Sequence, residues 1–526
     1  MSSTSKPAAL GDSFASPTRR WFTYAATAFA HAPGFSTAAG LVTLGLAIYV
    51  RWAVALGSYS GRGVQPTYGD YEAQRHWMEL TYHLPVDQWY FYSPTYWRLD
   101  YPPLSAYLSW LCGAIAHWID PTWVALDTSR GIETPDSKVF MRATVLVCEL
   151  IVYVPAVYLF LRAGKSASDT VQWVHRQTLW LLILLQPALI LIDHGHFQYN
   201  SVMLGLVLWT VVAFQRQFYI LGAISFCLAL AFKQMALYFA PAVFAFLLGK
   251  CFQGPRGIQL FVKLGLTVAL TTAICFGPFL GSWAQLSQVL QRIFPVDRGL
   301  YEDKVANFWC ASNVVLKLRH VWKQEALVKL SAAVTLAALL PACYAVARRP
   351  TLPRFLYALA ISALAFFLFA FQVHEKSILL PALPITLLMD RERTFAFFFV
   401  NVAVFSMYTL LQRDEIVLSH AVCTLFWNWL GGFPFNIPNV PLRRAIYAVF
   451  TTMLSIHLLD ALVPPPARYP HIYIVANVLL SCGLFGLSFL YLNYRLLGSN
   501  LTSRSASTTN SRLKSLGRTT PRKKRA

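Results

Sequence analysis

The residues Leu41-Val-Thr-Leu-Gly-Leu-Ala-Ile-Tyr-Val-Arg-Trp-Ala-Val-Ala-Leu56 form the first long apolar run of the chain. Runs of about 15 to 24 apolar residues recur along the whole sequence, and runs of this length cross a bilayer as helices. The 526-residue chain is 56% hydrophobic and only 13% charged, whereas a soluble protein carries about 25% charged residues. The sequence therefore predicts an all-α polytopic membrane protein built as one continuous helix bundle.

Thirteen further apolar runs bring the expected number of transmembrane helices to about fourteen. They cover residues 139–161, 177–193, 200–214, 218–232, 235–249, 258–280, 326–346, 355–372, 377–389, 394–411, 415–432, 445–463 and 472–494. This number places both termini in the cytosol and puts most basic loops there too, as the positive-inside rule requires. Segment 309–330 fits poorly, because its basic residues would then be luminal.

The predicted topology divides the chain into three parts. Residues 1–36 form a cytosolic segment, residues 37–494 a transmembrane catalytic domain, and residues 495–526 a basic cytosolic tail. The domain contains two large luminal loops, 57–138 and 281–325. The first loop holds nine acidic against five basic residues and many Trp and Tyr side chains, a composition typical of a bilayer interface. Within it, Asp70–Thr81 and Leu104–Trp118 are expected to be helices near the membrane plane.

The net charge of +21 does not indicate a nucleic-acid partner, because the basic residues lie in short loops and in the tail. The tail ends in Lys523-Lys524-Arg525-Ala526, which resembles the dilysine signal that the COPI coat recognises when it returns proteins to the endoplasmic reticulum. Contact with membrane lipid is the alternative for these basic residues. The nine cysteines are scattered without a C-x-x-C pair, so they indicate neither a zinc site nor a disulfide framework.

The polar stretch Tyr68–Thr81 contains Asp70, the residue we expect at the chemical centre. Asp70 opens a helix-like segment, so it is either a helix N-cap or an ionised general base, and the two roles are compatible. Half of a metal site is another interpretation, with Glu72, His194 and His196 as further ligands. Carboxylates two residues apart on a helix diverge by about 200°, which disfavours joint chelation. Arg51, near the end of the first run, either snorkels to the interface or contacts an anionic ligand.

Several cations are expected on the same side as Asp70. They are Lys233, Arg292, Arg298, Lys304, His374 and Lys376. Each alone is an ordinary interfacial side chain, but together they indicate an anionic ligand, and phosphate is the natural one in a lipid setting. Glu302 and Asp303 lie among them and either pair with these cations or contact the substrate.

Six motifs together resemble the eukaryotic dolichyl-phosphate-glucose-dependent glucosyltransferase family. They are Gly69-Asp-Tyr-Glu-Ala-Gln-Arg-His-Trp-Met-Glu79, Leu99-Asp-Tyr-Pro-Pro-Leu104, His194-Gly-His-Phe-Gln-Tyr-Asn200, Phe232-Lys-Gln-Met235, Arg292-Ile-Phe-Pro295 with Arg298-Gly-Leu-Tyr-Glu-Asp-Lys-Val-Ala-Asn307, and Val373-His-Glu-Lys-Ser377. The similarity is closer to the branch that adds the first α-1,3-linked glucose to high-mannose GlcNAc2-PP-dolichol than to the sister branch that adds the second. Tyr71 replaces the usual Phe. The last third resembles the family mainly in hydropathy.

The resemblance implies a GT-C membrane glycosyltransferase fold in the endoplasmic reticulum membrane, a luminal active site and an inverting transfer. Asp70 would match the general base for the acceptor mannose hydroxyl. His374 would lie near the donor phosphate, with Lys233, Arg298 or Lys304 as further candidates. The remaining substrate-binding candidates are Glu72, Arg75, Asp100, Glu302, Asp303 and Lys376. No metal or other cofactor is expected. A polytopic lipid or sugar transporter is the alternative from another class, but the chain shows no evident internal repeat.

Overall fold

The computed structural model describes residues 16–29, 34–92, 96–162, 170–294 and 304–498, and over these ranges the regular secondary structure is helical. The first eleven helices are α1 (Pro17–Phe29), α2 (Phe35–Ala55), α3 (Gly69–His83), α4 (Pro103–Ile119), α5 (Pro135–Arg162), α6 (Thr170–Leu184), α7 (Pro187–Ile190), α8 (Asn200–Gln215), α9 (Tyr219–Phe232), α10 (Ala240–Phe252) and α11 (Gly257–Phe276). The others are α12 (Trp283–Ile293), α13 (Phe308–Leu316), α14 (Leu318–Val321), α15 (Gln324–Arg348), α16 (Leu352–Phe369), α17 (Leu379–Leu387), α18 (Arg393–Ser406), α19 (Tyr408–Arg413), α20 (Val417–Gly431), α21 (Val440–Leu462) and α22 (Ile472–Gly498).

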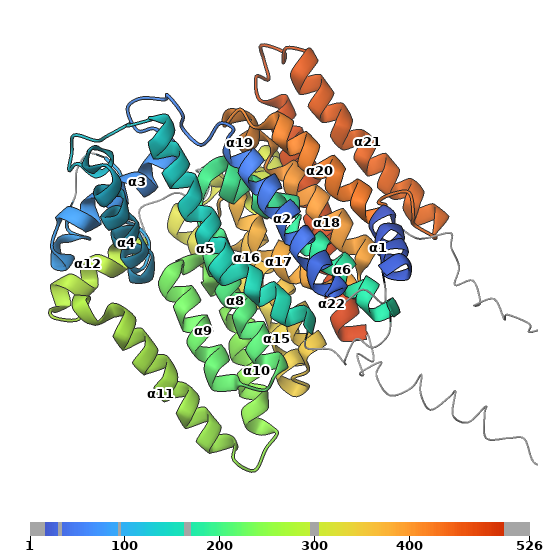
Figure 1. Ribbon diagram of the computed structural model, residues 1–526, viewed down its shortest axis with the longest axis horizontal. Helices are drawn as coiled ribbons and strands as arrows, with labels where there is room; N and C mark the ends of the chain where they lie inside the picture. Colours follow the sequence, from blue (N-terminus) through green and yellow to red (C-terminus); the bar gives the residue numbers. More distant parts are fainter. Residues whose placement is uncertain (1–15, 30–33, 93–95, 163–169, 295–303, 499–526) are drawn as a thin grey trace, which may run out of the picture.

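The predicted all-α polytopic membrane architecture is confirmed, whereas the number of about fourteen transmembrane helices stays a prediction. Each apolar run predicted from the sequence contains a helix, and nine helical segments in the described ranges are long and apolar enough to cross a membrane. They are Ser36–Ala55, Pro135–Arg162, Thr170–Phe197, Gln234–Phe252, Gly257–Phe279, Gln324–Arg348, Leu352–Phe369, Val440–Leu462 and Ile472–Gly498. Helices α8, α9 and α18 are apolar but shorter. The long helices run side by side as a bundle (Figure 1).

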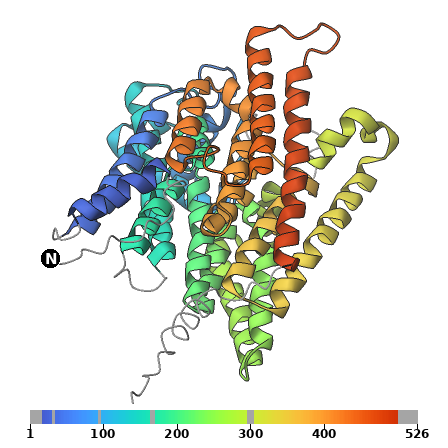
Figure 2. The same ribbon diagram turned by 90° about the vertical axis from the view of Figure 1, so that its right-hand side faces the viewer.

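The position of each helix in the bundle follows from its apolar surface. Helix α16 is apolar all round and is buried from Phe355 to Ala365, as expected of a helix surrounded by other helices. Helices α11 and α21 instead lie at the edges (Figures 1 and 2) and expose apolar side chains such as Leu266 and Leu454. Such exposed apolar faces suit contact with lipid chains.

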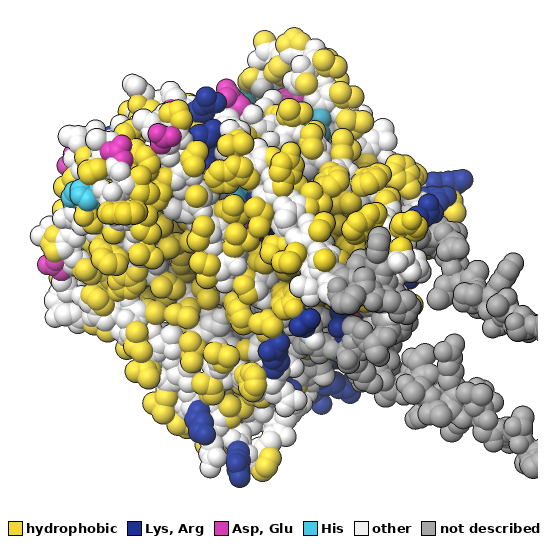
Figure 3. Space-filling view, viewed as in Figure 1, with side chains coloured by type: hydrophobic (Ala, Val, Ile, Leu, Met, Phe, Trp, Pro, Cys, Tyr) yellow, Lys and Arg dark blue, Asp and Glu magenta, His cyan; other side chains and the backbone are white. Residues whose placement is uncertain are grey.

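Charged side chains are distributed unevenly over the surface. On the face in Figure 3, the visible acidic side chains lie along the upper and left edges, with some basic side chains beside them, whereas the region around the α10–α11 turn and beside α1 carries basic side chains. The basic lower end agrees with the predicted topology. The side that faces the cytosol stays a prediction.

Residues 57–138, the first predicted luminal loop, form two packed helices where two were expected. Helices α3 and α4 pack against each other, and α12 from the second loop joins them at the same end of the bundle (Figure 1). An apolar cluster joins the three; it includes Trp77, Leu80, Leu99, Ala106 and Val289. Helix α3 is buried at every position from Tyr71 to Thr81. It is therefore an enclosed element of the protein, unlike an amphipathic helix that rests on a bilayer.

Arg51 has neither of the two roles expected of it. Its guanidinium is 2% exposed and pairs with both carboxylate oxygens of Glu149 on α5, at 2.7 and 2.8 Å. Glu149 also bonds His194 Nε2 at 2.6 Å. Arg51 therefore links α2 to α5 inside the bundle. A buried guanidinium without a counter-charge is strongly destabilising, and Glu149 supplies that charge.

Candidate active site

Asp70 lies in the first turn of α3, but not at the helix cap. The N-cap position falls on Tyr68, whose backbone is left-handed (φ 57°) and whose own side chain makes no capping hydrogen bond. The Asp70 backbone N–H donates to Ser60 Oγ at 3.2 Å. The N-cap interpretation of Asp70 is therefore wrong, and its carboxylate points to other partners.

Three donors from distant parts of the chain converge on one oxygen of Asp70. His196 Nε2 lies 2.9 Å from Oδ2, Gln198 Nε2 donates to it at 2.6 Å, and the Lys376 ammonium also donates to Oδ2. No described side chain is hydrogen-bonded to Oδ1. The Asp70 side chain is 25% exposed. One oxygen is thus anchored by the protein, and the other is available to a bound molecule.

The electrostatic setting keeps this carboxylate ionised. Burial alone would raise the pKa of Asp70, but the Lys376 ammonium and His196 outweigh that effect and hold the pKa well below its usual value. An ionised carboxylate with one open oxygen has the geometry and charge of a general base.

Replacing Lys376 with Met, which keeps the length and removes the charge, should make the base easier to protonate. The burial of Asp70 would then be less compensated, so its pKa rises. We expect the acidic limb of the kcat/KM profile to move to higher pH, because this limb reports protonation of the base in the free enzyme. The measurement is initial transfer rate against pH. An unmoved acidic limb would contradict the assigned pairing of Lys376 with Asp70.

Lys233 lies beneath this site, where it cannot reach a bound phosphate. Its ammonium is 1% exposed and donates to Gln198 Oε1 at 2.8 Å and to Asn200 Oδ1 at 2.7 Å. Asn200 Nδ2 in turn donates to Asp193 Oδ1 at 2.9 Å. The Tyr101 ring covers the ammonium at 4.7 Å. The structure therefore assigns Lys233 to orienting Gln198 and not, as expected, to contacting substrate.

A π-helix, Leu191–Phe197, brings His196 to the site. Wide turns of this kind are frequent at functional sites. Arg142 of α5 fixes the backbone here, donating to the carbonyl oxygens of His194 at 2.6 Å and Gly195 at 2.9 Å. His196 Nδ1 lies 2.6 Å from Oδ2 of Asp414, directly after α19. Asp414 was missed from the sequence; its only signal there is an acidic residue in a short loop expected on the luminal side.

Glu72 and Arg75 face away from Asp70 and bind each other. Two guanidinium nitrogens of Arg75 bond the two oxygens of Glu72 at 2.5 and 2.7 Å, and its third bonds Glu79 at 2.6 Å. Burial would lower the pKa of Arg75, but its contacts with the two glutamates raise it. Burial would raise the pKa of Glu79, but its contacts with His76, Arg75 and Ser129 lower it to about 2. This buried network of Glu72, Arg75 and Glu79 holds α3 in place. None of the three has a described hydrogen bond with Asp70.

The four candidate metal ligands are likewise engaged with separate partners. Asp70 and His196 bind each other, His194 binds Glu149, and Glu72 binds Arg75. In the part of the chain that the structure describes, no group of three His, Cys, Asp or Glu side chains is arranged to hold a metal ion.

The structure places three of the remaining predicted residues, which are His374, Asp100 and Lys304. His374 is half-buried and directly precedes the turn Glu375–Ile378 that carries Lys376. The Asp100 carbonyl accepts from Gln234 Nε2 at 3.3 Å, and the same amide donates to the Ile293 carbonyl at 3.2 Å. Gln234, which the sequence did not single out, therefore joins the two luminal loops. Lys304 is exposed. The predicted residues Arg298, Glu302 and Asp303 lie outside the described residues.

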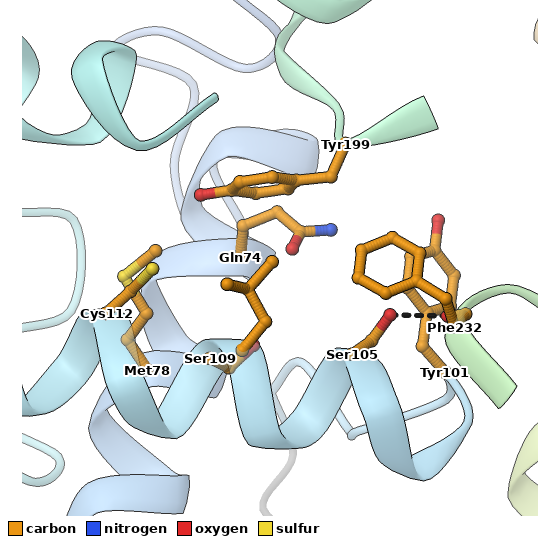
Figure 4. Close-up of a pocket in the computed structure, with 9 residues that line it drawn as sticks. Gln74, Met78, Tyr101, Ser105, Ser109, Cys112, Tyr199 and Phe232 are labelled. Carbon is orange, nitrogen blue, oxygen red and sulfur yellow. Dashed lines mark hydrogen bonds between the residues drawn. The ribbon is translucent and has the colours of Figure 1, made fainter. Parts of the chain in front are cut away.

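A small cavity borders the site between α3 and α4 (Figure 4). Gln74 and Met78 of α3 line one side, and Ser105, Ser109 and Cys112 of α4 line another. Tyr101, Tyr199 and Phe232 complete the lining that Figure 4 labels. Because the Tyr101 hydroxyl also donates to Gln198 at 3.3 Å, the cavity adjoins the network that holds Asp70.

An all-α bundle of membrane spans with an ionised, partly exposed carboxylate at one end has the architecture of a polytopic membrane enzyme. Comparison with known proteins gives the family. The profile of the ALG6, ALG8 glycosyltransferase family matches residues 47–491, and the chain belongs to this family.

Similar proteins span most of the chain. A chicken protein named dolichyl pyrophosphate Man9GlcNAc2 alpha-1,3-glucosyltransferase is 43% identical over 498 residues, which cover 88% of this chain and 97% of the relative. A Schizosaccharomyces pombe protein named as a probable enzyme of the same kind is 42% identical over 86% of this chain and 90% of its own length. A Saccharomyces cerevisiae protein, also named dolichyl pyrophosphate Man9GlcNAc2 alpha-1,3-glucosyltransferase, is 39% identical over 87% of this chain and 91% of its own length.

Proposed function

We propose that this protein transfers glucose from dolichyl-phosphate-glucose to the terminal mannose of high-mannose GlcNAc2-PP-dolichol, forming the first α-1,3-glucose linkage. The observation that carries the proposal is the asymmetric binding of Asp70: three donors occupy Oδ2, and Oδ1 accepts from no described side chain. The names of the relatives support this acceptor.

The proposed reaction needs one base and one in-line displacement. The C3 hydroxyl oxygen of the mannose attacks C1 of the glucose while Asp70 Oδ1 takes the hydroxyl proton. The bond between C1 and the phosphate oxygen breaks, and its electron pair leaves with dolichyl phosphate. The β-linked donor thereby gives an α-linked product without a covalent intermediate.

The leaving phosphate needs positive charge more than it needs a proton. Lys376 is 21% exposed and already lies at Asp70, and His374 precedes it by two residues. These two residues are the best-placed phosphate ligands among those described. Arg298 and Lys304 remain candidates from the second luminal loop, with Glu302, Asp303 and Asp100 as candidates for acceptor hydroxyls. No metal ion takes part in the proposed step.

The proposed setting is the endoplasmic reticulum membrane, with the Asp70 end in the lumen and both termini in the cytosol. The basic side chains around the α10–α11 turn and beside α1 support this orientation. The dilysine Lys523-Lys524 would serve retrieval by the COPI coat.

An acceptor comparison tests the proposal directly. Purified protein receives dolichyl-phosphate-glucose with either Man9GlcNAc2-PP-dolichol or its monoglucosylated form, each with and without a chelator. We expect one glucose to be added to the unglucosylated acceptor, at a rate that the chelator does not change. Transfer only to the monoglucosylated form would assign the chain to the sister branch, and loss of transfer in chelator would restore the metal interpretation.

A further inference from the structure

We infer that His196 is the positioning residue of the general base, and that buried Asp414 holds the His196 ring in the doubly protonated form that this role requires. The inference rests on the proposed function and adds two residues to its site. His196 comes from the π-helix, Asp414 from the loop after α19, and Asp70 from α3, so three distant segments meet in one line.

The contacts of both ring nitrogens with carboxylates favour a doubly protonated ring. His196 Nδ1 lies 2.6 Å from Asp414 Oδ2, and His196 Nε2 lies 2.9 Å from Asp70 Oδ2. An ionised carboxylate only accepts hydrogen bonds, and a neutral imidazole has a single N–H to donate. With both carboxylates ionised, both contacts are hydrogen bonds only if each ring nitrogen carries a proton, so the ring is assigned as an imidazolium between two carboxylates.

Burial makes Asp414 the counter-charge of this ring. Its side chain is 1% exposed and that of His196 is 2% exposed, so water cannot take the place of either partner. His196 is the described partner of Asp414 Oδ2, and Asp414 Oδ1 is buried without a hydrogen bond from any described residue. A buried carboxylate with such sparse bonding is stabilised chiefly by the positive ring beside it.

The other charged groups around His196 are arranged so that the imidazolium is tolerated. Lys376 Nζ lies 3.3 Å from Nε2 and opposes the positive ring, but it shares Asp70 Oδ2 with it. From α5, Arg142 binds the backbone carbonyls of residues 194 and 195, while Glu149 is paired with Arg51 of α2. The two cations at the site, Lys376 and His196, thus face the two carboxylates Asp70 and Asp414.

The functional consequence is a base with a fixed orientation. The imidazolium holds Asp70 Oδ2 and stabilises the carboxylate charge, so Oδ1 turns toward the side where a hydroxyl can approach. After transfer, the proton from the acceptor rests on Asp70 Oδ1, and His196 keeps both of its protons. His196 acts through Asp70 and does not itself touch the reacting atoms.

The chain provides a matched control for a purely structural role. His194 is also buried in the π-helix and also binds a buried carboxylate, Glu149, at 2.6 Å, but it does not contact Asp70. His194→Gln should therefore report loss of a buried imidazole–carboxylate bond without loss of base positioning.

The experiment compares His196→Ala, His196→Gln, Asp414→Asn and His194→Gln in purified full-length protein. Transfer from dolichyl-phosphate-glucose to Man9GlcNAc2-PP-dolichol is measured against pH, and donor binding and thermal unfolding are measured in parallel. We expect His196→Ala to lower kcat about 100-fold, the order of loss that misplacement of a reacting group causes. His196→Gln should recover part of this loss, because a glutamine amide also donates to Oδ2.

Asp414→Asn should move the acidic limb of kcat/KM to higher pH while donor binding persists, since the ring loses its counter-charge and Asp70 loses its charged donor. His194→Gln should lower thermal stability and leave the limb in place. The inference is overturned if all four variants keep the wild-type pH profile, or if His194→Gln moves the limb as far as Asp414→Asn.

A second measurement does not depend on activity and needs only one variant, His196→Gln, for the assignment. Nitrogen-15 NMR of histidine-labelled wild-type protein, with the His196 signal assigned by its absence in His196→Gln, should show two protonated ring nitrogens at pH 8. A neutral His196 ring at that pH would overturn the inference. Wild-type protein that transfers no glucose to either acceptor would instead remove the proposed function, whatever the ring signals show.

Discussion

Replacing Asp70 with Asn is expected to abolish glucose transfer, with a fall in kcat of about 10²–10⁴-fold, the contribution of a positioned general base. The amide keeps the shape of the side chain and can still accept a hydrogen bond from Gln198 or Lys376. It cannot take a proton from the mannose hydroxyl. Because the residues expected at the donor phosphate are unchanged, donor binding should persist.

Asp87→Asn is the matched control for this variant. Asp87 lies between α3 and α4, is exposed, and has no described side-chain contact with Asp70. The same chemical change there should leave the transfer rate within about twofold, because exposed substitutions away from a site have small effects. Equal losses in both variants would indicate a general effect of charge in this loop.

The largest expected effect on stability comes from Glu149→Gln in the bundle core. The change leaves the Arg51 guanidinium, now 2% exposed and paired, without its counter-charge. Removing one partner of a buried ion pair costs about 3–5 kcal/mol, because the remaining charge stays desolvated. The loss should appear as a lower unfolding temperature in detergent.

The double variant Arg51→Met with Glu149→Leu separates the charge from the packing. Replacing both partners by apolar side chains removes the desolvated charge, so the unfolding temperature should recover most of its loss. His194 Nε2 can still bond the glutamine amide in Glu149→Gln but has no polar partner at this position in the double variant, so a smaller loss should remain. A double variant less stable than Glu149→Gln would contradict this account.

The sequence was most informative where a local pattern determines the structure. Each apolar run became a helix because its length and composition leave no other stable state in a bilayer. The two helices of the first luminal loop were also predicted within about two residues at each end, the usual uncertainty of helix boundaries.

Pairing between distant residues could not be derived from the sequence. Nothing in the apolar run around Arg51 shows that Glu149 on another helix is its partner. Asp414 reaches His196 across 218 positions, and no motif marks it. The sequence predicts Lys233 as a cation available to substrate. Its burial depends on Tyr101 and Gln198, which come from other segments of the chain. Such pairings depend on how the helices pack against one another, and the local sequence pattern does not determine that packing.

The central claim is that Asp70 is the base for glucose transfer, and the most direct measurement is the single-turnover transfer rate of Asp70→Asn with dolichyl-phosphate-glucose already bound. Wild-type protein, Asp87→Asn and Asp70→Asn are loaded with labelled donor, their bound donor is quantified, and Man9GlcNAc2-PP-dolichol is added. The account predicts equal donor loading in all three and transfer in the first two only. Near-normal transfer by donor-loaded Asp70→Asn would contradict it.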